Sequence, residues 1–144
     1  MSTVGMLLKK FPEKGVIQIS PTNTVVDAVK VMKGKNISSL LIVDKEGSFV
    51  GILSERDISW KIVLENLNPA QVTVGEIMTS RDIIETVTEL TTLTECLDLM
   101  RQKNVRHLPV LQNGVLIGVI SIKDVAKHYE LLVDDLNHYI KGYR

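Results

Sequence analysis

Hydrophobic and polar positions follow a pattern that occurs twice along the chain, and each copy contains one clear helical stretch. Residues 24–35 place apolar side chains at i, i+3, i+4 and i+7, which predicts an amphipathic helix with one buried face. The apolar positions are Val25, Ala28, Val29 and Met32. Residues 92–103 repeat this stretch. Asn36 and Asn104 follow the two stretches, where a residue that tolerates left-handed backbone suits a helix end.

Short apolar runs predict three strands in each copy. They are residues 16–20, 37–43 and 49–53 in the first copy, and residues 84–88, 105–111 and 116–120 in the second. Turn sequences separate the last two strands of each copy, and the second turn contains Asn113-Gly114, a strong hairpin signal. Short helical lead-ins, residues 3–8 and 73–78, precede the copies. The predicted fold class is α/β (α+β), with β-α-β-β-α order in each repeat.

The last strand of each copy ends in the same motif, GILSERD at residues 51–57 and GVISIKD at residues 118–124. In each motif a serine precedes an acid by three residues, which is the pattern of a capping box at a helix start. The amides of a helix N-terminus also attract anions, and a carboxylate there can accept two hydrogen bonds from a ribose diol. Capping alone and ligand binding are both open for one such motif, and the duplication favours binding.

The repeats divide the chain into four predicted segments. They are a first repeat with its lead-in (1–65), a linker (66–72), a second repeat (73–130) and a C-terminal helical extension (131–144). Neither repeat is long enough for a comfortable core, so the two are expected to pack together with approximate twofold symmetry. The extension carries apolar residues at helical spacing, namely Leu132, Leu136, Tyr139 and Tyr143.

Composition narrows the classes of partner. Seventeen basic and seventeen acidic side chains cancel, so no net positive charge recruits nucleic acid or an anionic membrane. The single cysteine, Cys96, allows no internal disulfide and favours a reducing compartment, and its helical spacing predicts a core position. No apolar run approaches the ~20 residues that span a bilayer, and the N-terminus does not resemble a signal peptide. The expected location is therefore the cytoplasm.

Catalysis is not indicated. The histidines His107, His128 and His138 lack metal-ligand spacing, and no serine lies in a nucleophile elbow. A buried Cys96 would be a poor nucleophile. We therefore expect a protein that is not an enzyme and that holds no metal and no catalytic cofactor.

These motifs together resemble a tandem pair of CBS domains, also called a Bateman module, of the stand-alone kind. The resemblance covers about Thr3 to about His128 and rests on the two Gly-to-Asp motifs, on VGEIMT before the second copy, and on NVRHLPV. It implies a regulatory sensor that binds AMP, ADP or ATP in clefts between the repeats. NAD(H) or S-adenosylmethionine as the ligand, or a ligand-free dimerisation module, are the alternatives.

The resemblance also implies roles for individual residues. The ribose would be held by Asp57, Asp124, Ser54 and Ser121. The phosphate candidates are Arg56, Lys123, Arg106, His107, Ser38 and Ser39. The adenine pocket would be lined by Ile17, Ile37, Ile52, Ile84, Val105, Pro109 and Val119. The first copy lacks the Arg, His and Pro of NVRHLPV, so phosphate binding is expected to differ between the two clefts.

A homodimer is the expected assembly. Besides the apolar stripe of the extension, the residues Trp60, Val63 and Leu67 offer an apolar surface for a second copy. The repeats occupy almost all of this chain, so the ligand state is expected to pass to a separate downstream protein. The pattern leaves open which adenosine ligand binds and whether both clefts are used.

Overall fold

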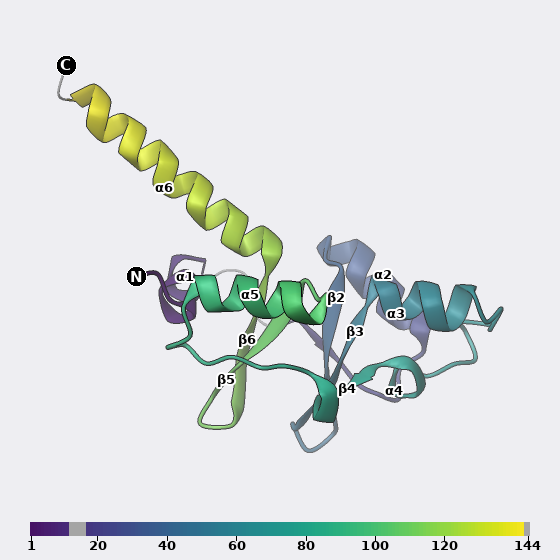
Figure 1. The fold of residues 1–144 in the computed structure, drawn as a ribbon. Coiled ribbons are helices and arrows are strands. Elements are labelled where there is room, and N and C mark those ends of the chain that lie inside the picture. Colours follow the sequence, from purple (N-terminus) through teal and green to yellow (C-terminus); the bar gives the residue numbers. More distant parts are fainter. Residues whose placement is uncertain (12–16, 143–144) are drawn as a thin grey trace. The chain divides into compact units, whose positions relative to one another are not determined.

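The computed structural model describes residues 1–11 and 17–142, and for residues 132–136 and 138–142 it describes the backbone only (Figure 1). The chain forms two compact units. Unit 1 consists of Met1–Gly15 and Glu85–Arg144, and unit 2 consists of Val16–Ile84. Each unit combines helices with strands, so the predicted mixed α+β class is confirmed.

Unit 2 is built on a four-stranded sheet. Its elements are β1 (Gln18–Ile19), α2 (Val25–Lys35), β2 (Ser39–Val43), β3 (Phe49–Ser54), α3 (Glu55–Ile58), the π-helical turn η2 (Ser59–Val63), α4 (Val74–Ile77), β4 (Thr79–Ser80) and the 3-10 turn η3 (Arg81–Ile83). The strands lie in the order β1-β2-β3-β4. β1 pairs with β2 in parallel, and the other two pairings are antiparallel. The predicted first-copy elements are therefore present, and the sheet gains a fourth strand from the segment that precedes the second copy.

Unit 1 repeats this arrangement with fewer strands. Its elements are α1 (Val4–Lys10), α5 (Leu93–Lys103), β5 (His107–Gln112), β6 (Val115–Ser121) and α6 (Ile122–Gly142). β5 and β6 form an antiparallel hairpin. The helix predicted for the C-terminal extension continues α6 without a break. The side chains of Leu132, Leu136 and Tyr139, and the whole of Tyr143, lie outside the described part of the chain.

The strand predicted at residues 84–88 is reduced to one parallel bridge, between Val87 and Val110. In unit 2 the amide of Leu41 donates to the carbonyl of Ile17 at 3.3 Å and extends the parallel ladder. The residue at the position of Leu41 in the second copy is Pro109, which has no N–H to donate. The ladder around Val87 therefore stops after two hydrogen bonds.

Helix ends follow the predicted chemistry. Thr24 caps α2 and Thr92 caps α5, each in a capping box with an acid three residues later. Asn36 and Asn104 end these helices in the left-handed conformation, with φ of 54° and 52°. The hairpin turn of unit 1 has positive φ at Asn113 (52°) and at Gly114 (79°), as a type I′ turn requires. These local predictions are confirmed.

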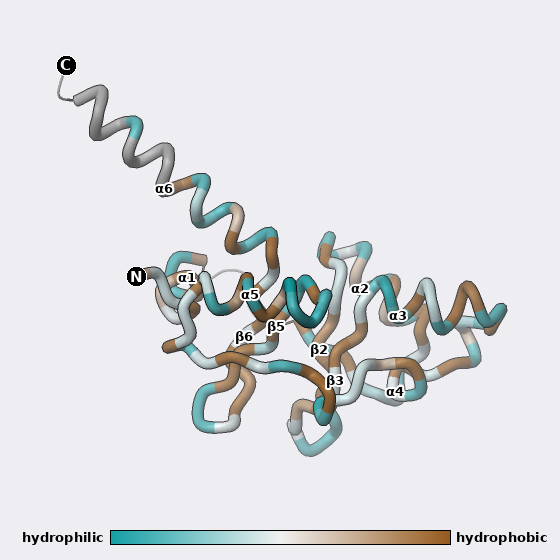
Figure 2. Tube along the Cα trace, in the orientation of Figure 1, coloured by the Kyte–Doolittle hydropathy of each residue, from teal (hydrophilic) through white to brown (hydrophobic). Residues whose placement is uncertain are grey.

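Each unit encloses its own hydrophobic core. In unit 2 the face of α2 packs on one face of β2 and β3, through Val25, Ala28, Met32, Leu40 and Leu53. In unit 1 the matching core contains Leu93, Cys96, Met100, Leu108 and Ile120. Figure 2 shows hydrophobic residues concentrated on the strands, with hydrophilic residues alternating along the helices. One predicted core position is wrong, because Val29 lies at the edge of the apolar face of α2 and is 43% exposed.

The lead-in helices close these cores, and each packs in the unit of the other repeat. α1 precedes the first repeat but lies in unit 1, where Val4 and Leu7 join the core. α4 precedes the second repeat but lies in unit 2, where Val74 and Ile77 join the core. The compact units therefore differ from the sequence repeats, because each unit takes its lead-in from the other repeat.

Main-chain hydrogen bonds hold both lead-ins in the same way. Val4 N donates to Thr91 O at 2.8 Å, and Leu93 N donates to Ser2 O at 3.0 Å. The equivalent bonds in unit 2 join Val74 N to Asn23 O at 2.8 Å and Val25 N to Val72 O at 3.0 Å. Isolated bridges pair Thr3 with Thr92 and Thr24 with Thr73. The lead-in is thus hydrogen-bonded to the N-terminal end of α5 in unit 1 and to the N-terminal end of α2 in unit 2.

A substitution at the first glycine of each Gly-to-Asp motif tests this packing. A Cβ at Gly51 would lie 2.6 Å from the Thr79 carbonyl oxygen and 2.7 Å from the Met78 sulfur, whereas a Cβ at Gly118 would meet only the flexible end of Leu8, at 3.3 Å. We expect Gly51→Ala to lower the free energy of unfolding by ~1–3 kcal/mol and Gly118→Ala to lower it less. Urea denaturation of the two variants measures both effects. Equal losses of unfolding free energy in the two variants would contradict the tight contact between β3 and the segment after α4.

His128 is the buried titratable side chain that joins α6 to the N-terminal segment. It is 4% exposed, and its Nε2 lies 3.2 Å from Ser2 Oγ. Its Nδ1 has no hydrogen-bond partner among the described residues. Burial lowers the pKa of His128 below its ordinary 6.5, and the positive charge of Lys10 adds to this effect. The neutral imidazole is therefore the form that the folded unit accommodates.

This burial predicts a pH-dependent stability. Below pH 6.5 the unfolded chain binds a proton at His128 that the folded unit resists, so stability present above that pH is lost as the pH falls. We expect the melting temperature of the wild type to drop more steeply below pH 6.5 than that of His128→Gln, which keeps a polar group without the titration. Thermal melts between pH 8 and pH 5 compare the two proteins. Parallel pH profiles would show that His128 does not titrate on unfolding.

Candidate functional site

In unit 1 the predicted motif forms a capped helix start. β6 ends at Ser121, whose amide donates to Asp124 Oδ2 at 2.8 Å, while the Asp124 amide donates to Ser121 Oγ at 3.1 Å. Asp124 is half-buried, and Lys123 beside it is exposed. α6 starts here and runs for 21 residues, so the positive end of its dipole lies at this turn. The predicted capping box is confirmed.

The start of β5 lies beside the same turn. Ile122 N, the first amide of α6, donates to Arg106 O at 3.0 Å, and His107 pairs with Ser121 across the hairpin. Arg106 is exposed and His107 is half-buried. The basic residues of NVRHLPV and the Ser–Asp turn, distant in sequence, are therefore neighbours within one unit.

Apolar side chains continue from this turn along the hairpin. Pro109, which is buried, pairs with Val119, which is half-buried, and neither belongs to the core that contains their neighbours Leu108 and Ile120. Side chains alternate between the two faces of a strand, so this pair lies on the face opposite the core. Val105 precedes β5 and packs half-buried against the core. Three of the predicted adenine-pocket residues thus belong to the same hairpin.

Unit 2 contains the equivalent turn. Ser54 caps α3, Ser39 pairs with Ser54 across β2 and β3, and Glu55 N donates to Ser38 O at 3.1 Å. Ile52, which is half-buried, pairs with Leu41, which is fully buried although it does not belong to the cluster packed on α2. The backbone frame therefore matches unit 1, while serines stand where unit 1 has Arg106 and His107.

Three other residues predicted to line the adenine pocket lie outside the strands of the two hairpins. Ile17 and Ile37 pack half-buried against the core of unit 2. Ile84 follows η3 and is the last residue of unit 2.

Asp57 has more partners than a capping box supplies. Its Oδ2 accepts from Ser54 N at 3.0 Å and from Ser54 Oγ at 3.2 Å. The hydroxyl of Thr79, in β4, lies 3.1 Å from Oδ1 and 3.3 Å from Oδ2. Lys61 Nζ lies 3.0 Å from Oδ1 and donates to Ile77 O at 2.8 Å. Asp57 is 6% exposed, so this carboxylate lies inside a polar network.

The roles of Lys61 and Thr79 were not predicted. The spacing of Asp57 and Lys61 is the i, i+4 spacing of helical ion pairs, which is a usable signal. Thr79 is 22 residues from Asp57, and nothing local in the sequence indicates that contact.

Arg56 has a partner on its own helix. Its guanidinium lies 5.4 Å from the ring centroid of Trp60, within the range of a cation–π interaction. Trp60 is 59% exposed. A phosphate bound by Arg56, as predicted, would therefore contact a guanidinium that already stacks on an exposed tryptophan.

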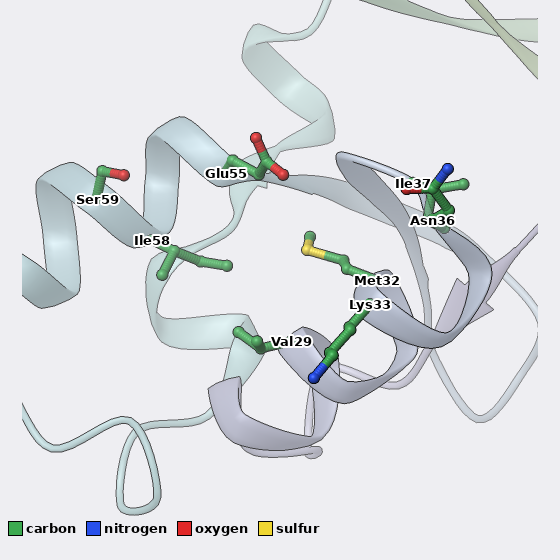
Figure 3. Close-up of a pocket in the computed structure, with 8 residues that line it drawn as sticks. All are labelled: Val29, Met32, Lys33, Asn36, Ile37, Glu55, Ile58 and Ser59. Atoms are coloured by element: carbon green, nitrogen blue, oxygen red, sulfur yellow. The ribbon is translucent and has the colours of Figure 1, made fainter.

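A surface pocket opens between α2 and α3 of unit 2 (Figure 3). Apolar side chains from both helices point toward its centre, and Lys33 and Glu55 lie at its sides. Its lining residues are Val29, Met32, Lys33, Asn36, Ile37, Glu55, Ile58 and Ser59. Of these only Ile37 was predicted as a site residue, and Glu55 belongs to the GILSERD motif, so the pocket adjoins the Gly-to-Asp turn.

Two other kinds of site, a reactive cysteine and a metal centre, have no support in the described part of the chain. Cys96 is fully buried, as predicted, and burial raises the pKa of its thiol to about 11, which disfavours the nucleophilic thiolate. Among the described residues, no group of three or more His, Cys, Asp or Glu side chains is placed to hold a metal ion. None of the helices in residues 1–11 and 17–142 combines the length and the hydrophobicity needed to cross a lipid bilayer.

Comparison with known proteins identifies the fold. A family model of the CBS domain matches residues 8–63 and 74–131. The mitochondrial CBS domain-containing protein CBSX3 of Arabidopsis thaliana is 36% identical over 127 residues, which are 83% of this chain and 61% of that protein. The chain also spans 66% of the length of relatives from Methanopyrus kandleri and Acidianus ambivalens. It is thus shorter than the curated relatives that it matches.

Solved structures agree with this result. A protein from Burkholderia ambifaria MC40-6, described as a signal-transduction protein with CBS domains, is 38% identical with a TM-score of 0.83, covering 89% of this chain and 93% of that one. The hexameric CBS-CP12 protein from bloom-forming cyanobacteria is 31% identical with a TM-score of 0.68, covering 77% of this chain and 64% of that one. With both repeats matched in sequence and structure, the chain belongs to the CBS domain family, as a pair of CBS repeats.

Proposed function

We propose that this CBS pair binds an adenosine nucleotide, AMP, ADP or ATP, at the turn between β6 and α6, and that the bound state regulates a separate protein. The observation that carries the proposal is the pairing of His107 with Ser121 across the hairpin, together with the hydrogen bond between Arg106 O and Ile122 N. These contacts put the basic side chains and the Asp124 carboxylate on adjoining backbone.

The chemistry of these groups matches an adenosine nucleotide. A ribose diol donates hydrogen bonds, and a half-buried carboxylate such as Asp124 accepts them. A phosphate accepts hydrogen bonds, and the donors would be Arg106, Lys123 and a protonated His107. Val119, which is half-buried, would contact the adenine through its apolar side chain.

Local charge is important because the chain as a whole is neutral. With no net field to attract an anion, affinity for phosphate has to come from the few cations beside the turn and from the N-terminus of α6. Unit 2 has Ser38 and Ser39 in place of Arg106 and His107, so its turn has only Arg56, at the position of Lys123, as a cation for phosphate.

Regulation would follow from differential affinity. A nucleotide shifts the conformation of the pair only if it binds one arrangement more tightly than another. A downstream protein that prefers that arrangement would then read the nucleotide concentration. The same chemistry admits NAD(H) and S-adenosylmethionine, which share the adenosine group.

Thermal shift assays test nucleotide binding. A ligand present at ~100 times its dissociation constant should stabilise the folded protein by about 2.7 kcal/mol if it binds only that form. We expect AMP, ADP or ATP to raise the melting temperature, and Arg106→Gln to reduce the rise without changing the melting temperature of the free protein, because Arg106 is exposed. GMP serves as the control for the base. If AMP, ADP, ATP, NADH and S-adenosylmethionine all leave the melting temperature unchanged, a ligand-free interaction module replaces the proposal.

We also propose that the chain forms a homodimer through the apolar surface that follows α3. Trp60 is 59% exposed, Val63 69% and Leu64 74%; the first two belong to η2 and Leu64 directly follows it. Exposed apolar patches of this kind favour association. A similar protein, CBS-CP12, is hexameric, which supports association of CBS pairs through some surface.

Removal of the tryptophan tests this surface. We expect Trp60→Ser to shift the chain from dimer toward monomer in sedimentation velocity, because it removes the largest apolar side chain of the patch. Leu90→Ser is the matched control, since Leu90 is 81% exposed in a turn of unit 1. A dimer that persists in Trp60→Ser and is lost in Leu90→Ser would move the interface to unit 1.

A further inference from the structure

The residue four positions after each motif aspartate contacts a lead-in segment. In unit 2 this residue is Lys61, whose ammonium donates to the carbonyl of Ile77, the last residue of α4, at 2.8 Å. In unit 1 it is His128, whose Nε2 lies 3.2 Å from Ser2 Oγ, two residues before α1. A lysine ammonium keeps its charge through the neutral and acidic range, whereas an imidazole changes charge close to neutral pH. Equivalent positions thus hold equivalent segments with side chains that respond differently to acid.

The surroundings of His128 suit the neutral imidazole. The side chain is 4% exposed, and its ring meets the Tyr129 ring edge-on with 5.6 Å between the centroids. A protonated imidazole has two N–H donors, and the Ser2 hydroxyl can accept one of them. The other donor, at Nδ1, would be buried without an acceptor, because Nδ1 has no hydrogen-bond partner among the described residues. A proton on His128 is therefore costly while Ser2 stays in place.

Charged groups on the neighbouring elements do not offset this cost. α1, α5 and β6 pack against α6, and β6 has no charged residue. Lys10, in the last turn of α1, adds to burial in lowering the pKa of His128. On α6 itself, the Asp124 carboxylate accepts in the helix cap and Lys127 lies over the Phe11 ring. Other charged side chains on these elements are exposed, namely Lys9, Glu95, Asp98, Arg101, Lys103 and Glu130.

The lead-in is the element that can move away from His128 without breaking the sheet of unit 1. Main-chain hydrogen bonds join Ser2, Val4 and Gly5 to residues 89–93, and Val4 and Leu7 are the buried side chains of α1. β5 and β6, by contrast, pair with each other along their whole length. Segments with few buried contacts open at a lower free energy than central strands. Relief of a buried charge at His128 is therefore obtained most cheaply by opening of the lead-in.

We propose that His128 makes the attachment of the first lead-in sensitive to acid. When the imidazole takes up a proton from solvent, residues 2–11 leave the core of unit 1, while α4 stays attached to unit 2 through Lys61. The release uncovers the part of the core that Val4 and Leu7 close. It needs neither a bound nucleotide nor a second copy of the chain, so it stands apart from the proposed function.

Hydrogen exchange of the full chain at about pH 7.5 and about pH 5.5, corrected for the intrinsic rate of each amide, tests the release. The open segment leaves His128 with its ordinary pKa of 6.5, whereas the closed segment resists the proton. Opening of residues 2–11 should therefore become several-fold more frequent at the lower pH, up to about tenfold. The amides of Val74–Ile77, in α4, should show no such change and serve as the control within the same molecule.

The single cysteine gives a second readout. Cys96 is fully buried in the same core as Val4 and Leu7. Its rate of reaction with a disulfide reagent, divided by the rate for the urea-unfolded chain at the same pH, should rise at the lower pH by the same factor as the exchange. The division removes the direct effect of pH on the amount of thiolate.

Variants assign the response to His128. His128→Gln should abolish the difference between the two pH values, and His138→Gln, which removes another histidine of α6, should retain it. If His128→Gln does not fold, Lys10→Gln decides, because Lys10 is exposed and its charge opposes the protonated imidazole. At low ionic strength, Lys10→Gln should open less in acid than the wild type, and Lys9→Gln, which removes the neighbouring exposed lysine, should match the wild type.

Three results would overturn the proposal. The first is equal protection of residues 2–11 at both pH values in the wild type. The second is an acid response in His128→Gln as large as that of the wild type, or equal responses in Lys10→Gln and Lys9→Gln. The third is an equal rise of exchange in β5 and β6, because acid would then unfold the whole unit rather than release the lead-in.

Discussion

The main-chain pairing between each lead-in and the helix start of the other repeat is the constraint on which this structure depends. Thr3 pairs with Thr92 and Thr73 pairs with Thr24, and the following amides donate to the turn that precedes α5 or α2. Because each lead-in brings two buried apolar side chains, the core of a unit is complete only when residues from both halves of the sequence are present. Separate expression of one repeat would leave that core open.

The same constraint positions the candidate site. In unit 2 the lead-in continues into β4, which pairs with β3 beside the Ser–Asp turn and carries Thr79 to the carboxylate. In unit 1 the N-terminal segment reaches α6 through Ser2 and His128 instead. The segments packed on the two Gly-to-Asp motifs therefore differ in sequence between the units.

Most of the local structure was predictable, and the reasons are local. Thr24 with Asp27, Thr92 with Glu95, and the two Ser–Asp pairs place an acceptor and a donor three residues apart, which is sufficient to begin a helix. The short ladder at Val87 could have been predicted as well, since Pro109 has no amide hydrogen. The partner of each lead-in was not predictable, because an apolar periodicity shows that a face is buried and not which core receives it.

The candidate site shows the same limit. The neighbourhood of Arg106, His107 and Ser121 follows from the hairpin that Asn113-Gly114 predicts. The contact of Thr79 with Asp57 crosses 22 residues and depends on the tertiary position of the lead-in, so the motif alone did not predict it.

An NMR titration of the uniformly ¹⁵N-labelled chain with AMP tests the account most directly. The account predicts progressive shifts of the amide signals of Arg106, His107, Ser121 and Asp124. Shifts centred on Ser54 and Asp57, or a spectrum that AMP does not alter at all, would contradict it.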